Sequence, residues 1–429
     1  MTLTRRSFLA VTAALGATAL GVGACTSPTT ANPGKLTLWY SSNGLSEKVL
    51  GEAVARFPER HLVPSKVSGE LKQRLLAALS GEAYLPDITM IGDDISTYFA
   101  AADRFVDLNS VGAQQDQDRY LDWKWQAGRT PGGVQLGFPI DIGPAALYYR
   151  HDLFREAGLP SEPDEVAAAV STWDDYFEFG KRAQEKLPGR YMITDTKTVF
   201  TYSLAQESKK YLDKQNRYLS DQSQVRRAWD RAVQAFRMGL TAGYAGNASS
   251  SGDSIDRNAA WSTGKELSFV SASWITGSLK QAAPNTSGNW HLCRPPGGPG
   301  NQGGSFLAIT RYCPDPQGAY EVVKWILGPE NQPRTYLELG LFPSSPAVYD
   351  DPQLLQPEEF FGGQSTMSVF GAVAKEVPAV YFSPYDITIS DTYTDELTNV
   401  ESAGKDPDRA WDDANRLVER LLRRQGVLA

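Results

Sequence analysis

Adjacent carboxylates are the side chains of this sequence best suited to chemistry. Asp93 and Asp94 follow residues 87–91, an apolar run that is typical of a buried strand. Paired carboxylates can do general acid and base work, as in the hydrolysis of glycosidic bonds. Neighbouring side chains on an extended backbone point apart, which argues against a catalytic pair. Two interpretations stay open: hydrogen bonding to ligand hydroxyls at the carboxyl edge of a sheet, and a solvated turn.

A tryptophan and a third carboxylate are further candidate ligand contacts. Trp274 follows the apolar run 267–270 and three small residues. Its indole could offer an open face to a sugar ring, whereas a core tryptophan would hide that face and satisfy its ring N–H. Asp141 lies close to Gly143 and Pro144, where the chain is expected to be extended.

Signatures of metal and nucleotide chemistry are missing or weak. His61, His151 and His291 are far apart in the sequence and lack the HExxH spacing of a zinc site. A GxGxxG match at residues 298–303 is surrounded by prolines, which favours a plain loop over a dinucleotide site. We therefore expect no metal and no cofactor.

The first 25 residues indicate export. Arg5 and Arg6, next to Phe8 and Leu9, resemble the twin-arginine signal, although an ordinary basic segment is the alternative. Residues 9–24 are too short and too weakly apolar for a permanent membrane span. The small residues before Cys25 resemble the bacterial lipobox. A signal peptide at residues 1–24, a lipidated Cys25 and a flexible tether at residues 25–34 are expected.

Length and charge restrict the remaining possibilities. Removing residues 1–24 from the 429 leaves 405, more than one hydrophobic core usually serves, so two lobes are expected. Loss of Arg5 and Arg6 changes the net charge from -8 to -10, which argues against nucleic acid and anionic lipid as partners. Cys293 and Cys313 could form a disulfide or remain two free thiols.

Hydrophobic spacing and capping residues predict alternating strands and helices. A strand is expected at residues 35–40, a helix capped by Ser46 and a strand at residues 87–91. Thr172 and Asp175 have the spacing of a capping box, and the last helix is expected at residues 408–422, with Leu417 facing inward. This order is that of an α/β protein.

The segment GFPIDIGPAALYYRHDLFREAGL at residues 137–159 resembles the extracellular solute-binding proteins of carbohydrate ABC transporters, bacterial lipoproteins. The resemblance runs from about residue 35 to the C-terminus and includes the GLFPSS ending of a helical pair near residue 343. It implies a periplasmic-binding-protein-like fold with a hinge between discontinuous lobes, residues 35–142 plus 298–345 and residues 143–297 plus 346–429.

The resemblance implies a binding protein that closes over a sugar and delivers it to permease subunits at the cell membrane. The polar or aromatic residues at strand ends expected to contact the ligand are Asn43, Asp93, Asp94, Asp141, Trp274 and Ser305. A secreted glycan-degrading enzyme using two of the carboxylates is the alternative. A third possibility is ferric iron bound by the phenolates of Tyr148 and Tyr149, but strand alternation places these on opposite faces.

Overall fold

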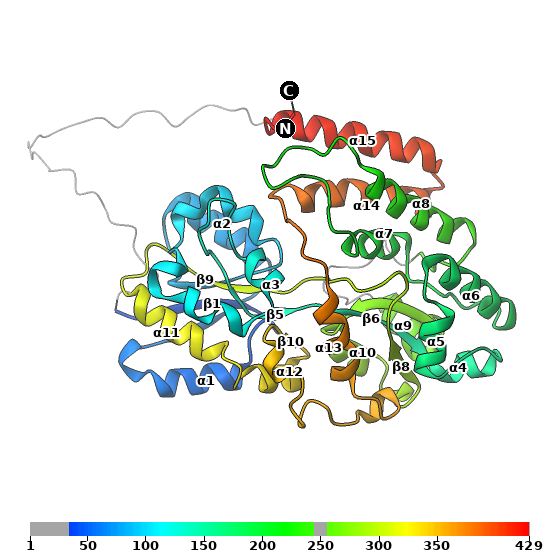
Figure 1. Cartoon of the computed structure of the whole chain (residues 1–429), viewed down its shortest axis with the longest axis horizontal. Helices are drawn as coiled ribbons and strands as arrows, with labels where there is room; N and C mark the ends of the chain where they lie inside the picture. The colour runs from blue at the N-terminus through cyan, green and yellow to red at the C-terminus, as the bar shows by residue number, and fades with distance from the viewer. Residues whose placement is uncertain (1–33, 244–254, 429) are drawn as a thin grey trace, which may run out of the picture.

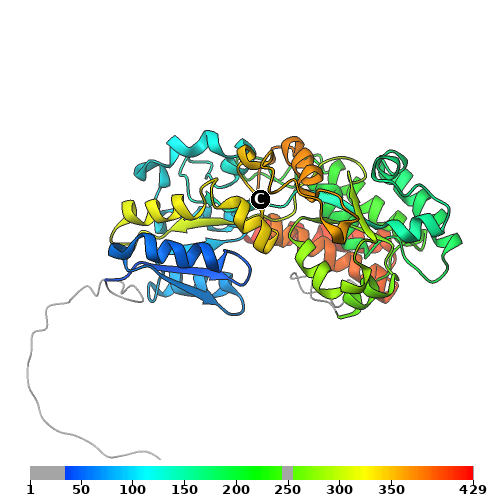
Figure 2. The ribbon, with the colours of Figure 1, turned by 90° about the horizontal axis from the view of Figure 1, so that it is seen from below.

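The protein has two lobes, as Figures 1 and 2 show, and a short two-stranded sheet joins them. The computed structural model describes residues 34–243 and 255–428. Lobe 1 contains a five-stranded sheet and lobe 2 a three-stranded sheet. Between them, β5 (Asp141–Ile142) pairs antiparallel with β10 (Phe342–Pro343). The α/β, two-lobed architecture expected from the sequence is confirmed.

The sheet of lobe 1 combines parallel and antiparallel pairs. Its strands, in spatial order, are β2 (Val63–Val67), β1 (Thr37–Ser41), β3 (Ile88–Ile91), β9 (Phe306–Ile309) and β4 (Phe138–Pro139). Strand β1 is parallel to β2 and β3, whereas β9 is antiparallel to β3 and β4. The carboxyl ends of β1 and β3 therefore lie at the same edge of the sheet.

Helices cover both faces of this sheet. On one face, α1 (Glu47–Arg56) and α11 (Pro316–Ile326) pack on a cluster that contains Leu38 and Ile88. On the other face, α2 (Leu71–Gly81) packs on a cluster that contains Phe306 and Ala308. Helix α1 begins where the sequence predicts, because the Ser46 hydroxyl accepts the N–H of Val49.

Lobe 2 is built around an antiparallel sheet of order β7 (Ser268–Ala272), β6 (Ala145–Arg150) and β8 (Trp290–Cys293). Its helices are α4 (His151–Glu156), α5 (Pro163–Ala169), α6 (Trp173–Lys186), α7 (Thr196–Ala205), α8 (Ser223–Arg237), α9 (Ile255–Thr263), α10 (Ile275–Ala282), α13 (Thr366–Glu376), α14 (Asp386–Ala403) and α15 (Pro407–Arg424). The largest core cluster joins β6 to α6, α7, α8, α14 and α15.

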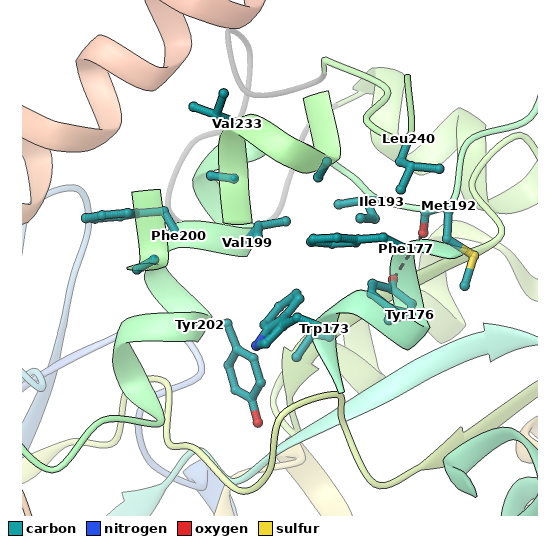
Figure 3. Packing of buried hydrophobic residues seen from close by; sticks show 14 of the residues in the cluster. Trp173, Tyr176, Phe177, Met192, Ile193, Val199, Phe200, Tyr202, Val233 and Leu240 are labelled. Carbon is teal, nitrogen blue, oxygen red and sulfur yellow. Dashed lines mark hydrogen bonds between the residues drawn. The ribbon is translucent and has the colours of Figure 1, made fainter. Parts of the chain in front are cut away.

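Large aromatic side chains pack among aliphatic ones in that cluster, as Figure 3 shows. Trp173 and Tyr176 lie at the start of α6, and the Tyr176 hydroxyl donates to the Met192 carbonyl at 3.3 Å. The capping box that fixes this end of α6 is confirmed: Thr172 accepts from the Asp175 N–H, and the Asp175 side chain accepts from the Thr172 N–H.

Two details differ from the expectations. In α15 the prediction that Leu417 faces inward is wrong: it is 40 % exposed, and Leu422 is buried instead. A register error of this kind arises because the apolar stripe continues around the helix. In α12 (Gln332–Leu339), which the predicted boundaries assign to lobe 1, Tyr336 packs in a cluster of lobe 2. The boundaries themselves remain a prediction.

The two described cysteines are free thiols, so the disulfide alternative is not realised. Cys293 is buried in the main cluster of lobe 2, whereas Cys313 is buried in the cluster of lobe 1 that contains β1 and α11. A disulfide requires α-carbons about 4.4–6.8 Å apart. Residues that belong to the cores of different lobes do not meet that requirement without rearrangement.

Candidate functional site

A cavity of about 540 Å³ lies between the lobes. From lobe 1 it is lined by residues that follow β3, including Asp93 and Asp94. From lobe 2 it is lined by α7, by residues after β7 and by the start of α14. Its volume falls in the range of about 300–1,000 Å³ that is usual for small-molecule sites.

The carboxylates of lobe 1 enter this cavity from the edge of the sheet. Asp93 keeps an exposed side chain there. Desolvation by the surrounding protein, and then the neighbouring Asp94 carboxylate, raise the pKa of Asp93. The Asp94 carboxylate is 2.5 Å from the ammonium of Lys72. Asp94 therefore has a fixed orientation, whereas Asp93 is available to accept a hydrogen bond from a ligand.

Trp274 forms part of the opposite wall. It follows β7, as expected, and its ring N–H donates to the carbonyl of Gln302 at 3.3 Å. The indole is half-buried and also lines a second cavity of about 650 Å³. A tryptophan with its N–H satisfied and part of its surface open can act as an apolar platform for a ligand.

Asn43 lies in that second cavity rather than beside Asp93. It follows β1 and has a φ of 60°. Residues of α10 and α12 line the same cavity. Trp274 thus lines both the cavity that contains Asn43, which follows β1, and the cavity that contains Asp93, which follows β3.

The described residues that line the two cavities do not include Asp141 or Ser305. Asp141 is 4 % exposed, and its carboxylate accepts the N–H of Ser305 at 2.7 Å. The two residues lie where the chain crosses between the lobes, so the expectation that they contact ligand is not met by this geometry. Instead, the Asp141 carboxylate and the Ser305 N–H form a hydrogen bond with each other.

The crossing segments are held together by backbone and side-chain hydrogen bonds. The Asn301 side chain accepts the N–H of Gly143 at 2.8 Å and donates to the carbonyl of Gly303 at 2.8 Å. A β-carbon at residue 143 would lie 1.8 Å from the carbonyl oxygen of Gln302, so only glycine allows this approach. The GxGxxG match at residues 298–303 is a loop before β9, as expected.

The lobe 2 residues that line the 540 Å³ cavity and that sequence reasoning missed include Lys210, Phe382 and Asp386. The Lys210 ammonium lies 3.9 Å from the centre of the Phe382 ring. Burial raises the pKa of Asp386 to about 6, although Lys210 opposes this shift. None of the three belongs to a local motif, and only the folded chain brings them together.

The iron alternative does not fit the geometry. Tyr148 and Tyr149 are fully buried on opposite faces of β6, in different clusters. The Tyr148 hydroxyl donates to the carbonyl of Ala272, and the Tyr149 hydroxyl to that of Ser161. Burial raises the pKa of both phenols, which disfavours phenolates. Within residues 34–243 and 255–428, no three His, Cys, Asp or Glu side chains gather as a metal site would require.

Comparison with known proteins identifies the family. The family model of bacterial extracellular solute-binding proteins matches residues 52–362. This chain belongs to that family. A solved extracellular solute-binding protein of family 1 is 28 % identical, with a TM-score of 0.84, over 90 % of this chain and 99 % of the other.

Other relatives of this solute-binding protein are more distant. A lactose-binding protein of Rhizobium radiobacter is 24 % identical over 85 % of this chain and 87 % of its own length. The sugar-binding protein MalE of Xanthomonas citri has a TM-score of 0.75 at 20 % identity, covering 92 % of this chain and 98 % of its own. The family and these relatives are binding proteins, and they give no support to the glycan-degrading alternative.

Residues 1–33 carry the predicted export signal, and with it Cys25, and lie outside the described residues. Among the residues that are described, no helix combines the length and apolar character needed to cross a bilayer.

Proposed function

We propose that this solute-binding protein captures a sugar or short oligosaccharide between its lobes and delivers it to an ABC importer. The observation that carries the proposal is the pairing of Asp93 with Trp274 across one cavity between the lobes. A carboxylate accepts hydrogen bonds from vicinal hydroxyls, and an indole packs on the apolar C–H face of a pyranose.

The names of the relatives support the same ligand class. They include the lactose-binding protein, an arabinooligosaccharide-binding protein of Halalkalibacterium halodurans that is 20 % identical over 85 % of this chain, and MalE. Binding would favour the closed arrangement of the lobes only by the difference between its affinities for the closed and open states. Asn43, in the adjoining cavity, is proposed to contact a longer ligand.

The N-terminal segment supports a location at the membrane surface. We propose that the chain is exported through its twin-arginine signal and held by a lipid on Cys25 beside the permease subunits. Replacement of Cys25 by serine would then release the protein from the membrane fraction of the producing cell. Retention of the Cys25→Ser chain in that fraction would contradict the anchor.

The ligand assignment is tested with the purified chain that begins after Cys25. Lactose, arabinotriose and maltose are added in turn, and tryptophan fluorescence, melting temperature and heat of binding are measured. At 100 times Kd, a ligand stabilises the folded chain by about 2.7 kcal/mol. If a broad panel of mono- and oligosaccharides changes none of these quantities, the sugar assignment is wrong.

A pair of variants locates the binding site. Trp274→Ala should raise Kd for the sugar that binds, because it removes the indole from the cavity wall. Trp325→Ala is the control, since Trp325 is also half-buried but lies on α11 outside that cavity. Equal loss of affinity in both variants would contradict the site.

A further inference from the structure

The segment that joins α13 to α14, residues 377–385, runs along the boundary between the lobes, as Figure 1 shows in orange. We call it the strap. Prolines at positions 378 and 384 keep it out of regular helix, and its sequence is rich in aromatic residues. Its place in the fold puts it in reach of both lobes.

Hydrogen bonds hold the strap to each lobe. The Ser96 hydroxyl, in the 3-10 helix η2 (Ile95–Arg104) of lobe 1, donates to the carbonyl of Ser383 at 3.0 Å. Both residues are buried. On the side of lobe 2, the Tyr381 hydroxyl donates to the side chain of Asn216 at 2.8 Å. The strap is therefore a fixed part of the cavity wall when the lobes meet.

Phe382 is the strap residue that faces the ligand cavity. Its half-buried side chain lines the 540 Å³ cavity together with Trp274. The ammonium of Lys210 lies 3.9 Å from its ring centre, a cation–π distance that restrains the ring. Trp274, which follows β7, and Phe382, from the strap, are thus both aromatic side chains of the cavity wall.

Polar groups stand beside this second ring. Asp386 is 5 % exposed and lines the same cavity. One of its oxygens accepts the N–H of Ser383, and its Oδ1 accepts no hydrogen bond from the described residues. The aromatic ring can pack on the apolar C–H face of a sugar. The nearby ammonium and the incompletely satisfied carboxylate can form hydrogen bonds with its hydroxyls.

We infer that Phe382 is a second aromatic contact for a pyranose ring, in a subsite completed by Lys210 and Asp386. The inference rests on the proposed function and adds the strap to the ligand site. Because the Ser96 hydroxyl joins the strap to lobe 1, this subsite lies where the two lobes meet.

The experiment measures Kd by calorimetry, with lactose and arabinotriose as probes, for three strap variants. Phe382→Leu keeps an apolar side chain and removes the ring face. It should raise Kd about threefold to tenfold, the range expected for loss of one aromatic contact. Phe382→Trp keeps a ring and should retain affinity within about threefold. Val380→Ala is the matched control, since Val380 lies on the strap but outside the 540 Å³ cavity.

The outcomes distinguish failure of the Phe382 inference from failure of the proposed function. An unchanged Kd for Phe382→Leu, with sugar binding intact in the wild type, overturns the inference and leaves the proposed function standing. An equal rise in Kd for Val380→Ala also overturns it, because the strap would then act only as a support. If the wild type binds no sugar of the panel, the proposed function fails and the inference fails with it.

Discussion

A buried lysine beneath the crossing segments gives a sharp test of the electrostatics. Lys124 of α3 (Asp122–Ala127) is 2 % exposed, and its ammonium lies 3.5 Å from the centre of the Phe306 ring. Burial lowers its pKa from 10.5 to about 7, although the carboxylates of Asp141 and Asp93 favour the charged form. The perturbation is Lys124→Met, which keeps most of the side-chain volume and removes the ionisable group.

The direction in which the free energy of unfolding changes with pH follows from the number of protons that the folded and unfolded chains bind. Between pH 7 and pH 10.5 the unfolded chain holds the Lys124 proton and the folded chain releases it. The free energy of unfolding of the wild type therefore rises with pH across this window, by at most about 1.4 kcal/mol per unit. From pH 7 to pH 9 the integrated gain is about 2 kcal/mol relative to Lys124→Met, in which this group is missing.

Urea unfolding followed by circular dichroism at pH 7, 8 and 9 measures the difference between wild type and variant. Because burial raises the pKa of Asp93 and of Asp141, the quantity compared at each pH is the difference between wild type and variant, both of which contain these two carboxyl groups. Lys181→Met, at an exposed position of α6, corrects for loss of one positive charge. A wild-type-minus-variant difference that stays constant within about 0.5 kcal/mol from pH 7 to pH 9 would refute the reasoning.

Three further predictions concern the cleft, the hinge and the thiols. The raised pKa of Asp386, about 6, means that the folded wild type loses stability as pH rises from 4 to 7. The free energy of unfolding of Asp386→Asn, minus that of the wild type, should therefore increase by about 2 kcal/mol between pH 4 and pH 7. If the two free energies change with pH in parallel, this prediction is wrong. Asn301→Ala leaves the Gly143 N–H without its acceptor and should lower the unfolding free energy by about 1–3 kcal/mol, measured in urea; a change within about 0.5 kcal/mol would be evidence against this role. A thiol reagent should label Cys293 and Cys313 only after denaturation, because both are buried and burial raises the pKa of Cys313 to about 12; labelling of the folded chain would show that these sites open.

Local signals in the sequence predicted the elements well. Ser46 and Thr172 cap helices as their side chains and spacing require. These features depend on neighbours a few residues apart, so the sequence alone contains the necessary information. The carboxyl-edge rule predicted Asp93 as a ligand contact, and its position after an apolar run predicted Trp274; both line the 540 Å³ cavity.

Residues that depend on long-range placement could not be predicted in this way. Asp141 has the type and setting of a ligand contact, but its partner is the backbone N–H of residue 305, more than 160 positions away. Phe382 and Asp386 enter the cavity because the strap crosses beside lobe 1, and no periodicity or motif near residue 382 indicates that crossing. Free thiols at Cys293 and Cys313 follow from their burial in separate cores.

The position of β9 in lobe 1 affects how the chain is made. Strand β9 lies between β3 and β4, pairing Ile91 with Phe306 and Pro139 with Phe306. During synthesis, β3 therefore has an unpaired apolar edge until residue 309 has left the ribosome, after most of the chain has been translated. Exposed strand edges promote aggregation, and late pairing partners slow folding. Nascent chains of this protein are thus expected to need protection by a chaperone before lobe 1 can close its sheet.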